Sequence, residues 1–229
     1  MNETLENKST ETVKAMLKRF CIVVIFGIAF AYIEAAVVVY LRTIFHPSGF
    51  TFPLAEFGIS EQWKQLLSTE VGREFATMIL ILTGAWLIGR NLRERFAYFM
   101  TIFAVWDIFY YIWLKVLINW PGSITDWDIL FLIPAAWAGP VFAPMLVSAG
   151  LAIFAVTILY RHAHSRDIKA GWIDWLGFIL AGAIVVSSFC ISGLHISQRD
   201  FDCYFYWPIF ASGYILAAAV FVKCLLQSG

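Results

Sequence analysis

Six long apolar stretches constrain the fold of this chain more than any other feature. Each has about 20 residues, which is the length that an α-helix needs to cross a hydrocarbon core of about 30 Å. The chain has 229 residues, of which 61% are hydrophobic and 14% are charged, and this balance excludes a soluble globular domain. We therefore expect an all-α, polytopic membrane protein: a six-transmembrane-helix bundle in a single domain.

The expected spans differ in length, since the second is short and the fourth is long. The fourth contains Pro134, Pro140 and Pro144. Because proline removes a backbone donor and clashes with the preceding turn, we expect this span to be broken, either kinked or partly unwound. The predicted regions are an N-terminal tail at 1–19, a transmembrane domain at 20–226 with spans at about 20–40, 74–88, 96–119, 129–160, 173–195 and 207–226, and a long loop at 43–72.

Lysine and arginine residues are unevenly divided between the two predicted membrane faces. Eleven lie on the side of the termini and five on the other side. The positive-inside rule therefore predicts that both termini are cytoplasmic and that loop 43–72 is extracytoplasmic. The formal net charge is zero and no basic face is evident, which argues against a nucleic-acid partner.

Four acidic residues lie in or beside the apolar stretches, all toward the predicted extracytoplasmic face: Glu34, Glu74, Asp107 and Asp128. An ionisable group at membrane depth costs a few kcal/mol or more, so it usually faces a protein interior or a water-filled cavity. Glu74 and Asp128 open their spans, where a carboxylate also suits the positive end of the helix dipole. For these two, a structural role is an equally good interpretation. Together the four predict a carboxylate-rich site opening to the extracytoplasmic face.

Basic and phenolic residues follow two of these acids at helical spacing. Arg42 follows Glu34 at i+8, and Tyr111 and Lys115 follow Asp107 at i+4 and i+8. Residues at these spacings share one face of a helix, so each helix is predicted to carry an acid with a base above it. The predicted catalytic residues are Glu34, Asp107, Lys115, Arg42 and Tyr111.

A divalent transition metal is one hypothesis for this site. Clustered acids in a low dielectric repel one another, and a cation, protonation or pairing with arginine and lysine can relieve that repulsion. A histidine, His46, follows the first span on the same side, although the sequence has no HExxH or ExxH spacing. The candidate metal ligands are Glu34, Glu74, Asp107, Asp128 and His46.

Three functions fit these observations. The first is a membrane-embedded enzyme, possible with or without a metal, that acts on a lipid-like, quinone-like or small anionic substrate, with Arg42 and Lys115 binding its negative charge. The second is a proton-coupled or ion-coupled carrier in which Asp107 and Glu34 titrate during transport. The third is an accessory subunit whose acids and bases form structural salt bridges. The partner common to all three is the lipid bilayer.

One segment of the chain resembles a known group of proteins. Residues 106–111 are WDIFYY, residues 127–134 are WDILFLIP and residues 137–141 are WAGPV, with Lys115 and Trp120 between the first two. In these motifs the chain is similar to a group of uncharacterised prokaryotic membrane proteins. The resemblance implies a multi-pass protein of the prokaryotic inner (plasma) membrane, and it implies no catalytic residue.

Overall fold

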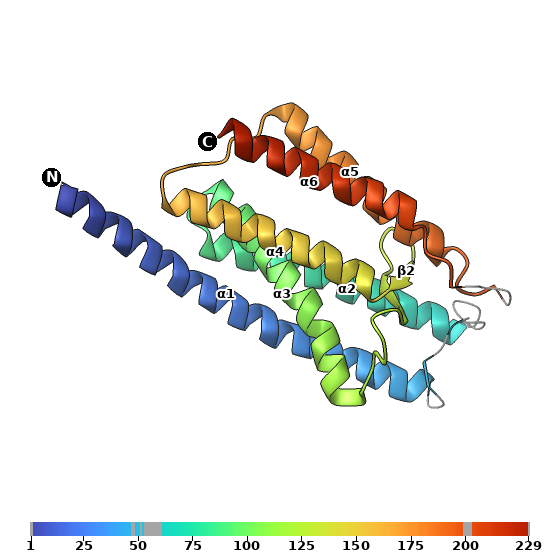
Figure 1. The fold of residues 1–229 in the computed structure, drawn as a ribbon. Coiled ribbons are helices and arrows are strands. Elements are labelled where there is room, and N and C mark those ends of the chain that lie inside the picture. Colours follow the sequence, from blue (N-terminus) through green and yellow to red (C-terminus); the bar gives the residue numbers. More distant parts are fainter. Residues whose placement is uncertain (1, 47–48, 51, 53–60, 199–202, 229) are drawn as a thin grey trace.

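The computed structural model contains long helices side by side and a β-hairpin at one end (Figure 1). It describes residues 2–46, 49–50, 52, 61–198 and 203–228. The described elements are α1 (Asn2–Phe45), α2 (Glu61–Ile88), α3 (Leu92–Ile118), β1 (Trp127–Phe131), β2 (Trp137–Pro140), α4 (Phe142–Ala163), α5 (Trp172–Gly193) and α6 (Trp207–Gln227). All six of these helices are long and apolar enough to cross a membrane, which confirms the expected all-α, multi-pass class.

Helix α3 is central and packs against α1, α2 and α4, whereas α5 and α6 pack mainly against each other. Buried alanines at the contacts, among them Ala31, Ala85 and Ala97, let the backbones of α1, α2 and α3 approach closely. Both chain termini lie at one end of the bundle and the hairpin lies at the other (Figure 1). These are called the terminal end and the hairpin end below.

The expected fourth span at 129–160 is wrong in its first part. The interruption lies at the prolines, as predicted, but residues 127–140 form an antiparallel hairpin instead of a kinked helix. Pro134 lies between the strands, and Pro144 lies in the first turn of α4, where a helix needs no backbone N–H donor. The hairpin is anchored to the preceding loop, because the N–H groups of Val141 and Phe142 donate to the carbonyls of Asp126 and Ile124 at 2.9 and 2.8 Å.

The expected second span and the loop at 43–72 also need correction. Helix α1 continues to Phe45, and α2 begins at Glu61 instead of residue 74, so both ends of the predicted loop are helical. Charged residues between 61 and 74 interrupt the apolar run, yet they continue one helix because Arg73 pairs with Glu70 one turn earlier. The remaining loop positions 47–48, 51 and 53–60 lie outside the described residues.

The hairpin also connects the α5–α6 pair to the rest of the bundle. Trp137 of β2 stacks on Phe189 of α5, with ring centroids 6.1 Å apart. Gly193, at the C-terminal end of α5, lies so close to the hairpin that an added Cβ would be 1.7 Å from the carbonyl oxygen of Ala136. The contact between α5 and the hairpin therefore requires a residue without a side chain at position 193.

Candidate functional site

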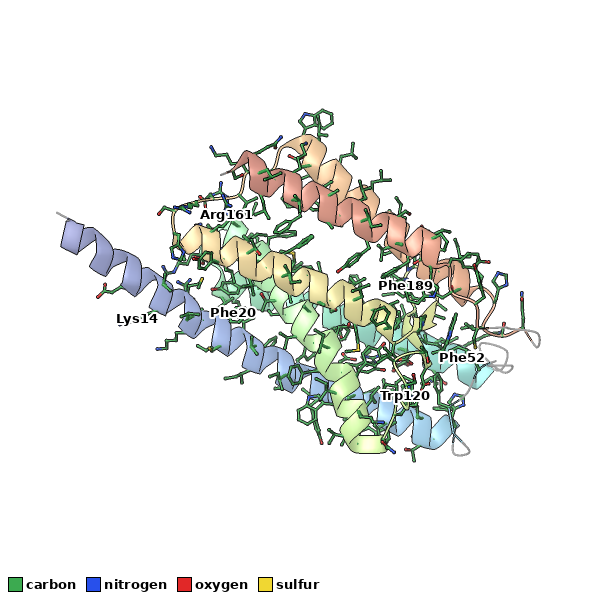
Figure 2. All side chains as sticks on the ribbon, viewed as in Figure 1. Lys14, Phe20, Phe52, Trp120, Arg161 and Phe189 are labelled. Carbon is green, nitrogen blue, oxygen red and sulfur yellow. The ribbon has the colours of Figure 1, made fainter. Side chains whose placement is uncertain are left out.

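A cavity of about 160 Å³ lies at the hairpin end, between α1, α2, α3 and β1. Trp120 and Phe52 are labelled near this end, and Lys14 and Arg161 near the other (Figure 2). Five acidic residues contribute to the cavity wall: Glu34, Glu70, Glu74, Asp107 and Asp128. Its basic and phenolic wall residues are Arg42, His46, Arg73, Tyr110 and Tyr111.

The first charged group of the cavity is the ion pair between Arg42 and Asp128. The Arg42 Nη2 donates to Asp128 Oδ1 at 2.9 Å, and the two side chains are only 9% and 3% exposed. The guanidinium also lies over the rings of Trp120 and Phe50, 3.8 and 4.3 Å from their centroids. This packing holds the cation of α1 against the first strand of the hairpin.

Asp128 has further donors. The Tyr110 hydroxyl donates to its Oδ2 at 3.4 Å, and the Ile129 N–H donates to its Oδ1 at 3.0 Å. Burial raises the pKa of the Asp128 carboxyl above its usual range, and the Arg42 guanidinium opposes that rise. The carboxylate form of Asp128 thus depends on Arg42.

The second charged group joins α1 and α2. The Arg73 guanidinium bonds Glu34 of α1 and also Glu70 one turn back on α2, where the Nη2 to Oε2 distance is 2.7 Å. The Thr77 hydroxyl also donates to Glu34. Glu34 is therefore satisfied by two residues of α2, and its charge is neutralised by Arg73.

Two acids of the cavity form no ion pair among the described residues, although Arg73 lies close enough to Glu74 to attract its charge. Glu74 accepts the backbone N–H of Leu132 at 2.8 Å, just after the first strand of the hairpin. Asp107 accepts the hydroxyl of Ser148 at 2.8 Å and is 8% exposed. Asp107 is thus a buried carboxyl with one neutral hydrogen bond, and such a group can hold or release a proton as its surroundings change.

The cavity wall also contains donors that lack an acceptor. Among the described residues, Arg42 Nη1, the Tyr111 hydroxyl and Trp106 Nε1 are all buried with no hydrogen-bond partner, and all three residues line the cavity. A buried donor without a partner costs about 1–3 kcal/mol. These atoms are shielded from the open space of the cavity, so an oxygen acceptor would reach them only after a small movement of the side chains.

Most of the residues predicted from the sequence meet in this cavity. Those that line it are Glu34, Arg42, His46, Glu74, Asp107, Tyr111 and Asp128. Lys115 does not, because its Nζ donates to the carbonyls of Asn119 and Pro121 at 3.4 and 2.9 Å and lies at the exposed end of α3. The ion pairs join different elements, because Arg42 of α1 bonds Asp128 of β1 and Glu34 of α1 bonds Arg73 of α2.

The site residues predicted from the sequence did not include Arg73, Thr77 or Ser148. The signal was present for two of them, because Glu70, Arg73 and Thr77 are three and four residues apart and so share a helix face. A prediction of helix for residues 61–73 would have placed Arg73 and Thr77 in the site. Ser148 gave no such signal, since only the packing of α4 on α3 brings it to Asp107.

The metal hypothesis is not supported. Among the described residues, no three histidine, cysteine, aspartate or glutamate side chains are close enough to hold one ion. Arginine pairs with two of the candidate ligands, Glu34 and Asp128, and His46 packs edge-on against Phe50 at 5.4 Å. Arginine pairing is thus the remedy for the charge repulsion at those two acids.

Fold and site together define a multi-pass helical membrane protein with a polar cavity at one end of its bundle. In comparisons with known proteins, no family model, no curated protein and no solved structure matches this chain.

The unpartnered hydroxyl of Tyr111 leads to a first prediction. Tyr111→Phe is expected to raise the free energy of unfolding by about 1–3 kcal/mol, because it removes a buried polar group that has no partner. Tyr110→Phe is the matched control on the same helix: it deletes the bond to Asp128 and should lower stability by about 1 kcal/mol. Thermal unfolding of both variants in one detergent measures the difference. A loss of stability in Tyr111→Phe would mean that the hydroxyl has a partner.

Proposed function

We propose that this protein is a membrane-embedded enzyme whose acid/base group is Asp107 and whose substrate enters at the hairpin end. The observation that carries the proposal is the coexistence, in one cavity, of a buried carboxyl without a cation and three buried donors without acceptors among the described residues. Under this proposal the free donors bind an oxygen of the substrate and Asp107 exchanges a proton with it.

The chemistry follows from where the charges lie. Arg42 and Tyr111 bind a carbonyl or phosphoryl oxygen and stabilise the negative charge that develops on it. Asp107 lies one helical turn from Tyr111 on α3, so its carboxyl reaches the same part of the cavity. Arg73 is already neutralised by Glu34 and Glu70, and it serves to position the wall between α1 and α2.

The apolar part of the wall indicates the substrate class. Val38 and Leu41 of α1 and Leu66 and Leu67 of α2 line the same cavity as the acids. A polar floor beside apolar helix faces suits an amphiphile that comes from the bilayer, such as a quinone-like or lipid-linked molecule. The reactive oxygen then lies at Arg42 and Tyr111, and the tail lies against α1 and α2.

A carrier fits this geometry less well. One to two turns deeper than the acids on each helix, the interior is apolar: Phe30 on α1, Ile81 on α2 and Ile102 on α3 belong to one buried cluster. A transport path would need polar groups or water at this level. The cavity is therefore a one-sided site, which favours chemistry over passage.

The proposed location is the prokaryotic inner membrane, with the hairpin end extracytoplasmic. The excess of lysine and arginine on the side of the termini supports this orientation.

The test compares wild type with Asp107→Asn in liposomes made from a total lipid extract that contains quinones. An asparagine at 107 still accepts the Ser148 hydroxyl, so the fold should be kept while proton transfer is lost. Mass spectrometry of the extract should reveal a species that wild type consumes, with a rate lower by about 10²–10⁴-fold in Asp107→Asn. Asp167→Asn removes a carboxylate outside the cavity and should match wild type.

Two outcomes would overturn the proposal. If no species differs between wild-type and empty liposomes, there is no enzyme acting on membrane lipids or quinones. If a pH-sensitive dye reports proton entry that needs Asp107 while the extract stays unchanged, the protein is a carrier. Equal unfolding midpoints for wild type and Asp107→Asn are required for either comparison.

A further inference from the structure

A second cavity lies between two pairs of helices, and the acidic residues of the first cavity do not line it. It has a volume of about 470 Å³ and lies between the α3–α4 pair and the α5–α6 pair. Figure 1 shows α5 and α6 as a unit beside α4. The wall is almost entirely apolar, and small residues such as Gly150, Gly182 and Ala217 give it the shape of a crevice.

The length of the crevice matches one leaflet of a bilayer. It runs along α4 from Val147 to Ile158, a rise of about 16 Å at 1.5 Å per residue. That is about half of the 30 Å hydrocarbon core. At its inner limit Tyr214 of α6 donates to the carbonyl of Leu146 at 3.2 Å, which ties α6 to α4. A partner helix would need the full thickness and a width of about 10 Å, so the crevice suits a hydrocarbon chain instead.

The mouth of the crevice carries both charges of an ion pair and one further cation. Its outer wall includes Arg93, whose side chain is 50% exposed and pairs with Asp167 at 2.6 Å, and the loop residues Ile168 and Ala170. Between these two lies Lys169, which is exposed, and Trp172, 76% exposed, follows at the start of α5. Exposed cations and a tryptophan at one level are typical of the headgroup region, and cations there attract anionic lipids.

We propose that this crevice binds an acyl chain of an anionic phospholipid from the leaflet at the terminal end. The chain lies between α4 and α5–α6, and the phosphate lies near Lys169, beside the Arg93–Asp167 pair. Burial of successive methylenes supplies the affinity, and Lys169 supplies the preference for an anionic headgroup. This site is separate from the proposed enzymatic cavity, so the failure of either proposal leaves the other intact.

Native mass spectrometry of the detergent-purified protein with dioleoyl-phosphatidylglycerol or dioleoyl-phosphatidylcholine tests the proposal. Wild type should retain one phosphatidylglycerol in preference to phosphatidylcholine. Gly182→Leu places a side chain in the crevice, and its Cβ would meet nothing within 4 Å. Excluding two or three methylenes should weaken retention about tenfold or more. Gly72→Leu is the matched control, because it also meets nothing within 4 Å but lies on α2 outside the crevice.

Lys169→Gln should abolish most of the preference for the anionic lipid while leaving retention of phosphatidylcholine unchanged. Equal retention in wild type, Gly182→Leu and Gly72→Leu would overturn the proposal. A second measurement uses only wild type and so does not depend on whether the variants fold. A phosphatidylglycerol with a photoreactive acyl chain should label residues 147–158 and 175–185. Labelling confined to outward residues of α2, such as Leu80 and Leu87, would also overturn it.

Discussion

Replacing Arg42 with methionine is expected to lower the free energy of unfolding by about 3–5 kcal/mol, the usual result of removing one partner from a buried ion pair. The replacement leaves the Asp128 carboxylate, 3% exposed, without a cation. Methionine keeps most of the packing against Phe50 and Trp120, so the loss reports mainly the charge. Denaturant titration in mixed micelles, followed by tryptophan fluorescence, measures the change.

Two further variants make this measurement decisive. Arg93→Met removes the partner of Asp167 in a pair whose side chains are 50% and 33% exposed, and it should cost only about 0–1 kcal/mol. Arg42→Met combined with Asp128→Leu removes both charges and should recover most of the stability. If the two single variants lose equal stability, burial of the Arg42–Asp128 pair does not increase its contribution to the free energy of unfolding.

The double variant also separates the proposed enzyme from an accessory subunit. If the Arg42–Asp128 pair serves only structure, the double variant should regain its stability and keep the properties of wild type. If Arg42 binds substrate, the stable double variant remains inactive in the liposome assay. Stability and activity thus give independent answers from the same protein sample.

Gly193→Ala is expected to have an effect of similar size for a steric reason. The added Cβ would lie 1.7 Å from the Ala136 carbonyl oxygen and 2.6 Å from its carbon, and both are backbone atoms that cannot rotate away. Overpacking typically costs up to about 3 kcal/mol, and we expect this substitution to reach that limit. Unfolding in detergent measures the loss.

Gly182→Ala is the control for the loss of glycine within α5. Its Cβ would meet no atom within 4 Å, so the better helix propensity of alanine should leave stability unchanged or raise it by about 0.5–1 kcal/mol. Equal stability of the two variants would mean that α5 does not contact the hairpin as closely as described.

Much of the fold followed from hydropathy, because a span is defined by length and composition. The hairpin did not, since residues 129–133 are as apolar as a helix and hydropathy does not distinguish hydrogen-bonding patterns. The only local signals were Pro134 and Pro140. They marked the break but left its geometry open, and the packing of β2 on α5 completes the hairpin.

The sequence predicted most of the residues that line the site, but it did not predict which of them bond one another. Topology alone brings Glu34 and Asp128 toward one end of the bundle, whereas Asp107 lies near the middle of α3. Which base meets which acid depends on how the helices face one another. Arg73 and Glu34 are 39 residues apart, and Arg42 and Asp128 are 86 apart, so no local spacing could pair them.

The hairpin contacts a different part of the protein on each side. Asp128 and residues 129–132 line the polar cavity, while Trp137 packs on α5, one of the two helices of the α5–α6 pair. Interiors packed at crystal-like density transmit displacements instead of absorbing them. We therefore expect a shift of α5 at Gly193 to displace the hairpin, which includes the strand that holds Asp128 against Arg42.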